Sequence, residues 1–205
     1  KKAIPIRTFT PWEDEHPGFL EIDLVAHCDT TTEGSYLNTL TATDLATVGT
    51  ECQAVANKTQ LAVSQAILTM RQLLPFALLG LDSDNGSEFI NDTLLRYCQA
   101  EHITFTRSRP YQKNDQAHVE QKNWSVVRHT LGYDRLETPE ELALLSSIYT
   151  DLRLYINFVQ PVLKLVGKER VDSKTVRTYD RATTPYRRVL ALDSLSLDVK
   201  ARLSV

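Results

Sequence analysis

The sequence predicts an α/β domain built on a mixed five-stranded sheet, in which a three-stranded antiparallel meander is followed by two parallel strands and flanked by helices. Two observations lead to this fold class. Three short stretches between residues 18 and 56 have strand-like composition and are joined by polar turns. From residue 59 onward, segments with helical spacing alternate with short apolar segments, an order typical of helix-linked parallel crossovers.

The first strand is predicted at residues 18–28, GFLEIDLVAHC. Its alternation separates one apolar face from a face that contains two acids, Glu21 and Asp23. Residues 35–44 and 49–56 are rich in Thr, Val and Tyr and form the other two strands of the meander. Asp23 therefore lies in the middle of a largely apolar strand, a position in which an acid is rarely left without a partner.

The later elements are predicted from changes in the spacing of apolar residues along the chain. Apolar residues at helical spacing predict helices, a run of apolar residues at 76–84 predicts a buried parallel strand, and Thr138, Pro139 and Glu141 form a capping box. The predicted elements are helices at 59–74, within 87–100, at 116–131, 138–159 and 193–203, and strands at 76–84 and 103–106. Residues 108–115 are a polar loop, and 163–189 are basic and only weakly periodic.

Composition indicates an ordinary globular protein, because 42% of its 205 residues are hydrophobic. There is no signal-peptide core and no apolar run near the roughly 20 residues that span a bilayer, so we expect a soluble, cytoplasmic protein. Its three cysteines, Cys28, Cys52 and Cys98, are too scattered for a disulfide framework or a CxxC metal knuckle. The chain lacks an initiating Met, which indicates a piece of a longer protein.

Three regions are predicted: an arm or linker at 1–17, a catalytic core at 18–158 and a basic extension at 159–205. Residues 1–160 hold 13 Lys and Arg against 21 Asp and Glu, a net charge of −8, whereas residues 161–205 hold 10 against 5, a net charge of +5. An acidic part followed by a basic one suits a carboxylate site beside a phosphate-binding arm. A solvated tail explains the same charge equally well.

The stretch LDSDNGSEF, residues 81–89, carries the chemistry. An apolar run leads into Asp82 and Asp84, and the Asn85-Gly86 turn lets Asp84 project from the end of its strand. In a mixed sheet of this order, the strands of Asp84 and Asp23 can be neighbours. Glu120 opens the helix that follows a polar loop. Three acids aimed at one place repel each other unless a divalent cation lies between them, and Mg²⁺ suits an all-oxygen set.

These residues resemble the D,D(35)E signature of retroviral-type integrases and related bacterial insertion-sequence transposases. The resemblance covers about residues 18–158 and rests on strand-borne Asp23, the SDNGSEF turn around Asp84, and the 35 residues between Asp84 and Glu120. It implies a ribonuclease-H-like fold and a site of Asp23, Asp84 and Glu120 that binds two Mg²⁺ ions, for which Mn²⁺ can substitute. It also implies cleavage and strand transfer of DNA ends during transposition in a bacterial host.

Other residues are predicted to support this site or to hold DNA. Asp82, His118 and Asn85 are expected beside the catalytic acids, as structural or supporting groups. Basic and aromatic residues suited to phosphate contact and base stacking are predicted to bind DNA. These are Arg107, Arg109, Tyr111, Lys113, Lys122, Arg128, Arg187 and Arg188. A homo-oligomer, dimeric or larger, is expected from the resemblance alone.

Two alternatives remain open. Another ribonuclease-H-like nuclease, such as a resolvase or a hydrolase of RNA–DNA hybrids, would use the same carboxylates. A non-catalytic DNA-binding or assembly protein could also have kept the fold.

Overall fold

The computed structural model describes the backbone of residues 3–7, 16–110, 113–172 and 174–203, with their side chains except at 113, 114 and 202. One five-stranded sheet has the order β3-β2-β1-β4-β5. Its strands are β1 (Phe19–Ala26), β2 (Asn38–Asp44), β3 (Thr50–Val55), β4 (Gly80–Ser83) and β5 (Thr104–Arg107). The first three pair antiparallel, whereas β4 lies parallel to both β1 and β5. The predicted mixed sheet is confirmed, and the strands that carry Asp23 and lead to Asp84 are neighbours.

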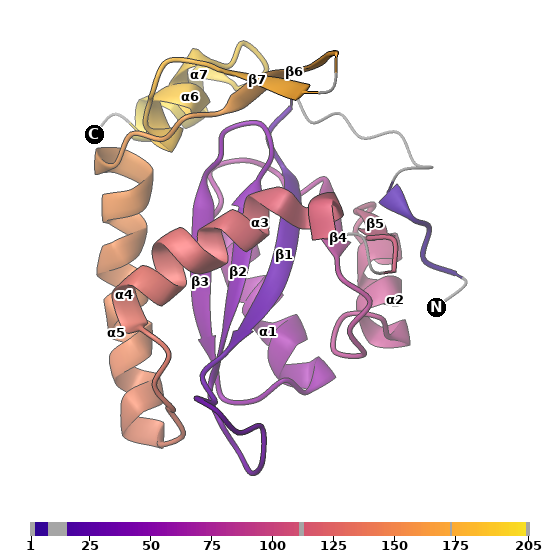
Figure 1. Cartoon of the computed structure of the whole chain (residues 1–205), viewed down its shortest axis with the longest axis vertical. Helices are drawn as coiled ribbons and strands as arrows, with labels where there is room; N and C mark the ends of the chain where they lie inside the picture. The colour runs from indigo at the N-terminus through magenta and orange to yellow at the C-terminus, as the bar shows by residue number, and fades with distance from the viewer. Residues whose placement is uncertain (1–2, 8–15, 111–112, 173, 204–205) are drawn as a thin grey trace.

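Helices cover both faces of this sheet, with α3 in front of it and α1 behind it in Figure 1. The helical elements of this part are α1 (Gln60–Leu73), α2 (Asp92–Ala100), η2 (Lys113–Gln116), α3 (Ala117–Lys122), η3 (Asn123–Arg128), α4 (His129–Leu131), α5 (Pro139–Leu154) and η4 (Tyr155–Val159). Thr138 and Glu141 form the predicted capping box at the start of α5. The predicted helix at 116–131 is one helical run with a π-helical middle, η3.

The alternation in β1 sorts its side chains between two cores. Leu20 and Ile22 pack into the core that α1 and α2 complete. Val25 belongs to a second core on the opposite face, with apolar residues of η3 and α5 such as Val127 and Leu145. Because successive side chains of a strand point to opposite faces, Glu21 and Asp23 lie on the face of Val25, which η3 and α5 cover.

β4 begins later than the predicted 76–84 strand. Gly80 pairs with Phe19, the first residue of β1, so the residues before Gly80 have no part of β1 beside them. The backbone N–H groups of Leu79 and Gly80 instead both donate to Gly18 O, at 2.8 and 3.0 Å. A Cβ at position 80 would lie 2.4 Å from the Phe19 ring, so this close approach needs glycine. The strand is therefore limited by the length of its partner.

Residues after 159 form structure that the weak periodicity did not predict. β6 (Leu165–Val171) and β7 (Lys174–Tyr179) make an antiparallel hairpin, and α6 (Pro185–Ala191) and α7 (Leu197–Leu203) follow it. The base of the hairpin is tied to the core, because Lys164 Nζ donates to Ala46 O at 2.8 Å. The short helix expected at 193–203 is present as α7. Within the described ranges, no helix combines the length and apolar character required to cross a membrane.

Candidate active site

Asp23 lies in the middle of β1 and is half-buried. Leu24 N donates to its Oδ1 at 2.8 Å, and Asn123 Nδ2 donates to its Oδ2 at 2.7 Å. The pKa of Asp23 is raised to about 6, chiefly by burial and in part by the negative charges of Asp84 and Glu120, against the lowering effect of these two hydrogen bonds. Asp84 and Glu120 therefore lie near enough to act electrostatically on Asp23, although the three residues are far apart in the sequence.

Asp84 directly follows β4, at the carboxyl end of a strand that lies beside β1. Gly86 N donates to Asp84 Oδ1 at 2.8 Å, which closes the predicted turn. Asn85 fixes that turn to the end of β5, because its Nδ2 donates to Ser108 O at 2.9 Å and its Oδ1 accepts from Arg107 at 3.1 Å. Asn85 thus orients the backbone that carries Asp84.

Glu120 is on α3, and its side chain is exposed. Asn123, one helical turn later, holds Asp23 and was not predicted from the sequence, although its spacing of three residues from Glu120 on one helix was a usable signal. Its Oδ1 is buried and accepts no hydrogen bond from the described residues. Among the residues that the structure describes, no group of three His, Cys, Asp or Glu side chains is already close enough to hold a metal ion.

A second pair of acids lies two residues before Asp23 and Asp84 along the chain, where Glu21 of β1 pairs in register with Asp82 of β4. Glu21 is fully buried and accepts from the N–H groups of His118 and Val119, at 3.0 and 3.1 Å. Its other oxygen accepts from Arg7 at 2.8 Å and lies 3.1 Å from His118 Nδ1. Glu21 therefore joins the strand of Asp23 to the start of the helix that carries Glu120.

The charges in this pair are unequal. Burial acts to raise the pKa of Glu21, but His118 and Arg7 together hold it below its usual value. Burial raises the pKa of Asp82 to about 6, with Thr106 and Arg7 opposing it. Thr106 donates to Asp82 Oδ1 at 2.6 Å, and Arg7 lies 3.7 Å from Oδ2. Asp82 is thus held by Thr106 and Arg7, and His118 is held by Glu21. Both residues contact neighbours other than the three candidate acids.

Several residues predicted to bind DNA are engaged within the protein. Arg107 donates to Ile4 O and to Asn85, and Arg109 makes two side-chain hydrogen bonds to Asp115, at 2.9 and 2.7 Å. Arg109 nevertheless keeps 45% of its side chain exposed, which leaves surface for a phosphate. Tyr111 and the side chain of Lys113 lie outside the described residues.

The other predicted DNA contacts differ in exposure. Lys122 is only 7% exposed, and burial lowers its pKa, so its ammonium is not presented to solvent in this conformation. Arg128 donates to Ala26 O at 2.8 Å and lies over the ring of Tyr133. Arg188 is paired with Asp180, whereas its neighbour Arg187 is exposed. Of these four, Arg187 is the best placed to meet a phosphate.

A cavity of about 550 Å³, including its open mouth, lies between β3, the end of α1, the end of α5 and α6. It is lined mainly by apolar side chains such as Leu74, Phe76 and Tyr186, and by the ion pair of Glu51 with Arg153. Burial raises the pKa of Glu51 to about 7. None of the three candidate acids lines this cavity, so it is separate from the candidate site.

Replacing Asn123 with alanine is expected to raise the pKa of Asp23 above its value of about 6. The amide donates to the ionised carboxylate, and removing that donor disfavours the charged form. The measurement is an NMR titration of the Asp23 carboxyl carbon in metal-free protein. Asn91→Ala, which removes the cap of α2 instead, is the control and should leave the Asp23 titration unchanged. An unchanged pKa in Asn123→Ala would contradict the assigned hydrogen bond.

Comparison with known proteins gives a sequence relative and structural neighbours. No family model matches the chain. The chain is 42% identical over 188 residues to an uncharacterised protein, y4rM, from Sinorhizobium fredii. This match covers 92% of the chain but 54% of the relative, so the chain spans about half the length of the curated protein it matches.

The structural neighbours are retroviral. The catalytic core domain of BIV integrase has a TM-score of 0.55 at 19% identity, covering 85% of this chain and 94% of that one. The HTLV-2 integrase catalytic core domain, solved in complex with magnesium, has a TM-score of 0.53 at 15% identity and covers 71% and 90%. A simian T-cell lymphotropic virus intasome has a TM-score of 0.54 at 14% identity and covers 71% and 50%. The chain therefore has the ribonuclease-H-like fold of integrase catalytic cores.

Proposed function

We propose that this chain is the catalytic core of a DDE transposase that cleaves DNA at element ends and transfers the resulting strand into target DNA. The observation that carries the proposal is geometric: β1, which carries Asp23, lies beside β4, which Asp84 directly follows. Glu120 lies on α3, and the helical run that begins with α3 contacts Asp23 through Asn123. The charges of Asp84 and Glu120 act on the carboxyl group of Asp23. Mutual repulsion in a half-buried place is costly unless a cation offsets it.

The donor set fits magnesium. Three carboxylates supply hard oxygen ligands, and Mg²⁺ uses few protein carboxylates together with water and substrate phosphate oxygens. Asn123 Oδ1, buried beside Asp23 without a donor from the described residues, is a further polar atom that a bound water would satisfy. Support also comes from the fold, since the HTLV-2 core of the same fold was solved with magnesium.

Each residue has a proposed role. Bound by the three acids, two Mg²⁺ ions would activate water or a DNA 3′-hydroxyl and stabilise the leaving oxygen, and Mn²⁺ would substitute. Asp23 and Asp84, held by Asn123 and Gly86, would hold the ions to which the reacting phosphate binds. Glu120 has an exposed side chain that can move toward the other two acids when a cation is present. Asp82, His118 and Asn85 would keep these elements in place.

The partners are proposed to be the element ends, target DNA and further copies of the same chain. Integrase cores of this fold have been solved as dimers and trimers, and one neighbour is part of an intasome. The relative is nearly twice as long as the match, so recognition of a specific end sequence is assigned to segments outside residues 18–158.

The test is a strand-cleavage and strand-transfer assay with Mg²⁺ on duplexes ending in the element's terminal repeats, compared with RNA–DNA hybrids. The proposal expects nicking and joining of the DNA ends and little action on the hybrid. Asp84→Asn is the matched inactive variant and should keep the fold.

Two outcomes would replace the proposal. Preferential cutting of the hybrid would favour an RNA–DNA hydrolase. A full absence of cutting, together with no rise in melting temperature on adding Mg²⁺ or Mn²⁺, would favour a non-catalytic protein, because an ion that binds the folded state stabilises it.

A further inference from the structure

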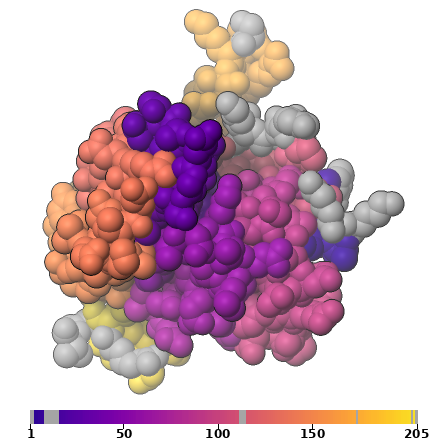
Figure 2. Space-filling view, turned by 90° about the horizontal axis from the view of Figure 1, so that it is seen from below, coloured from indigo at the N-terminus to yellow at the C-terminus, as the bar shows by residue number. Residues whose placement is uncertain are grey.

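The β6–β7 hairpin stands apart from the rest of the molecule. It forms a separate two-stranded sheet, and nearly all of its residues are exposed. Figure 2 shows it, in light orange, extending beyond the outline of the core. An isolated two-stranded hairpin is marginally stable in water, so an exposed arm of this kind would be stabilised by a bound partner.

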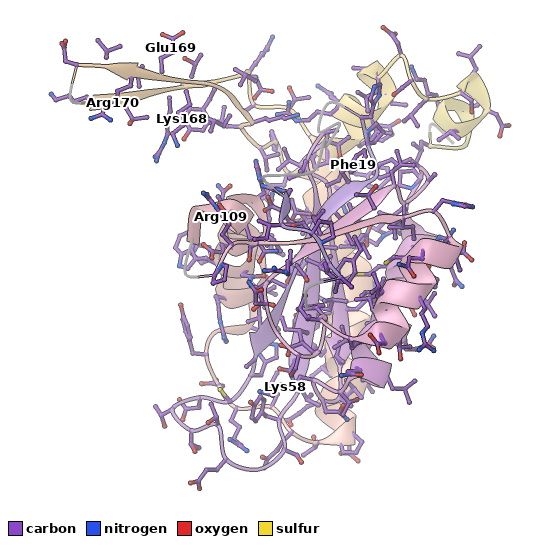
Figure 3. The ribbon with its side chains drawn as sticks, turned by 90° about the vertical axis from the view of Figure 1, so that its right-hand side faces the viewer. Phe19, Lys58, Arg109, Lys168, Glu169 and Arg170 are labelled. Atoms are coloured by element: carbon purple, nitrogen blue, oxygen red, sulfur yellow. The ribbon has the colours of Figure 1, made fainter. Side chains whose placement is uncertain are left out.

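The two faces of the hairpin carry different charges. Lys168 pairs in register with Arg177, and Arg170 with Thr175, so these four side chains share one face. This basic face, defined by Lys168, Arg170 and Arg177, has three positive charges and no acid. The opposite face contains Glu169 and Lys174, whose charges cancel. Figure 3 shows Lys168 and Arg170 on the lower side of the ribbon and Glu169 on the upper side.

The basic face is arranged at a cost to the hairpin itself. Lys168 and Arg177 lie directly opposite each other, and like charges in that position destabilise a strand pair. The cost disappears when an anion lies against both. The face also lacks the large apolar cluster that forms the centre of a protein interface, where lysine is depleted. A row of phosphates fits the basic face better than a protein surface does.

The hairpin is held in a defined direction at its base. Asp180, just after β7, accepts from Lys164 N at 2.7 Å and is paired with Arg188, which also donates to Val162 O. Arg188 therefore serves the hairpin's base. In Figure 3 the basic face is turned toward the side of the molecule on which Arg109 lies, and Lys58 lies at the opposite end.

We propose that the basic face of the β6–β7 hairpin binds the phosphate backbone of duplex DNA. The inference rests on the proposed function, in that it names the surface that holds DNA for the carboxylate site. Backbone contacts of this kind position a duplex and do not read its sequence. The hairpin would thus raise affinity for any duplex and leave the choice of element end to other segments.

The test measures duplex binding in EDTA, where the carboxylate site is inactive, by fluorescence anisotropy over a range of salt concentrations. The variant is Lys168→Gln with Arg170→Gln and Arg177→Gln. Its matched control is Lys58→Gln with Arg96→Gln and Lys174→Gln, which also removes three exposed positive charges but none from the basic face. Because the basic-face variant neutralises three fewer phosphates, the slope of log Kd against log salt should fall by about 2.7 and affinity on the order of 10-fold or more.

The control variant should keep the slope of the parent protein. The proposal is overturned if the basic-face variant binds DNA as the parent does, if the control loses as much, or if the variant instead changes oligomeric state in light scattering. The binding measurement needs no catalysis, so the two proposals can fail separately. If only the proposed reaction were wrong, the protein would not cleave DNA, but its DNA binding would still depend on the hairpin.

Discussion

Replacing Asp23 with asparagine is expected to abolish metal-dependent cleavage and at the same time to stabilise the metal-free protein. Activity should fall on the order of 10³-fold or more if Asp23 binds the metal ions as proposed, because an amide would replace a carboxylate ligand. The free energy of unfolding should rise, because burial and the charges of Asp84 and Glu120 disfavour the ionised form of Asp23 in the folded protein. A residue that served only the fold would lower stability when replaced, so the two readouts together separate the roles.

The sign of the stability effect depends on pH. The pKa of Asp23 is about 6 in the folded protein and 3.8 in the unfolded chain, so the folded state binds this proton more tightly. The contribution of Asp23 to stability is therefore favourable at low pH and is lost as pH rises from 3.8 to about 6. Asparagine does not titrate. The difference in melting temperature between variant and parent should be small below pH 3.8 and open up toward neutral pH.

At neutral pH the free energy of unfolding of the variant should exceed that of the parent by about 2–3 kcal/mol at most, which corresponds to a rise on the order of 4–12 °C in melting temperature, measured by calorimetry in EDTA. Adding Mg²⁺ should raise the melting temperature of the parent and not of the variant. Asp92→Asn, an exposed acid on α2, is the control and should change neither the activity nor the response to Mg²⁺. A variant that cleaved element ends at the parent's rate would remove Asp23 from the site.

The sequence predicted the parts of this fold whose side chains face a core. Alternation in residues 18–28 predicted a strand with one apolar face, and the structure confirms the strand as β1. That its other face also packs on a core, through Val25, was not predicted. The helix at 138–159 was visible from its apolar stripe and capping box. The β6–β7 hairpin was not predicted, because both of its faces are exposed and no apolar alternation marks a buried side.

The candidate site was predictable in its acids but not in their supports. Asp84 and Glu120 stand out through local patterns, a turn after a strand and the start of a helix. Asn123 and Arg7 act on partners 100 and 14 residues away. The spacing of Asn123 from Glu120 places both on one side of a helix, but the neighbouring sequence does not identify Asp23 as the partner of Asn123 or Glu21 as the partner of Arg7. The hydrogen bonds that Glu21 accepts from the N–H groups of His118 and Val119 form only when β1 and α3 are brought together, so the sequence around Glu21 does not predict them.

Replacing Glu21 with alanine is expected to give the largest loss of stability among single changes near the site, about 3–5 kcal/mol. The carboxylate is fully buried, and its removal takes an acceptor away from Arg7 and from the N–H groups of His118 and Val119. Urea unfolding at neutral pH gives the magnitude. Because the pKa of Glu21 is held below its usual 4.5, its contribution is present above that pH and is lost as pH falls below it.

Glu21 also positions the helix that carries Glu120, and hydrogen exchange can separate that role from general stability. The amides of His118 and Val119 should exchange faster in Glu21→Ala than the loss of global stability accounts for, and cleavage should fall with them. Glu51→Ala is the matched control, since it breaks another buried ion pair of the same sheet, with Arg153, at the separate cavity. Its stability should fall while exchange at His118 and Val119 follows only the global change. If both variants loosened the start of α3 equally, Glu21 would be a structural acid with no special link to Glu120.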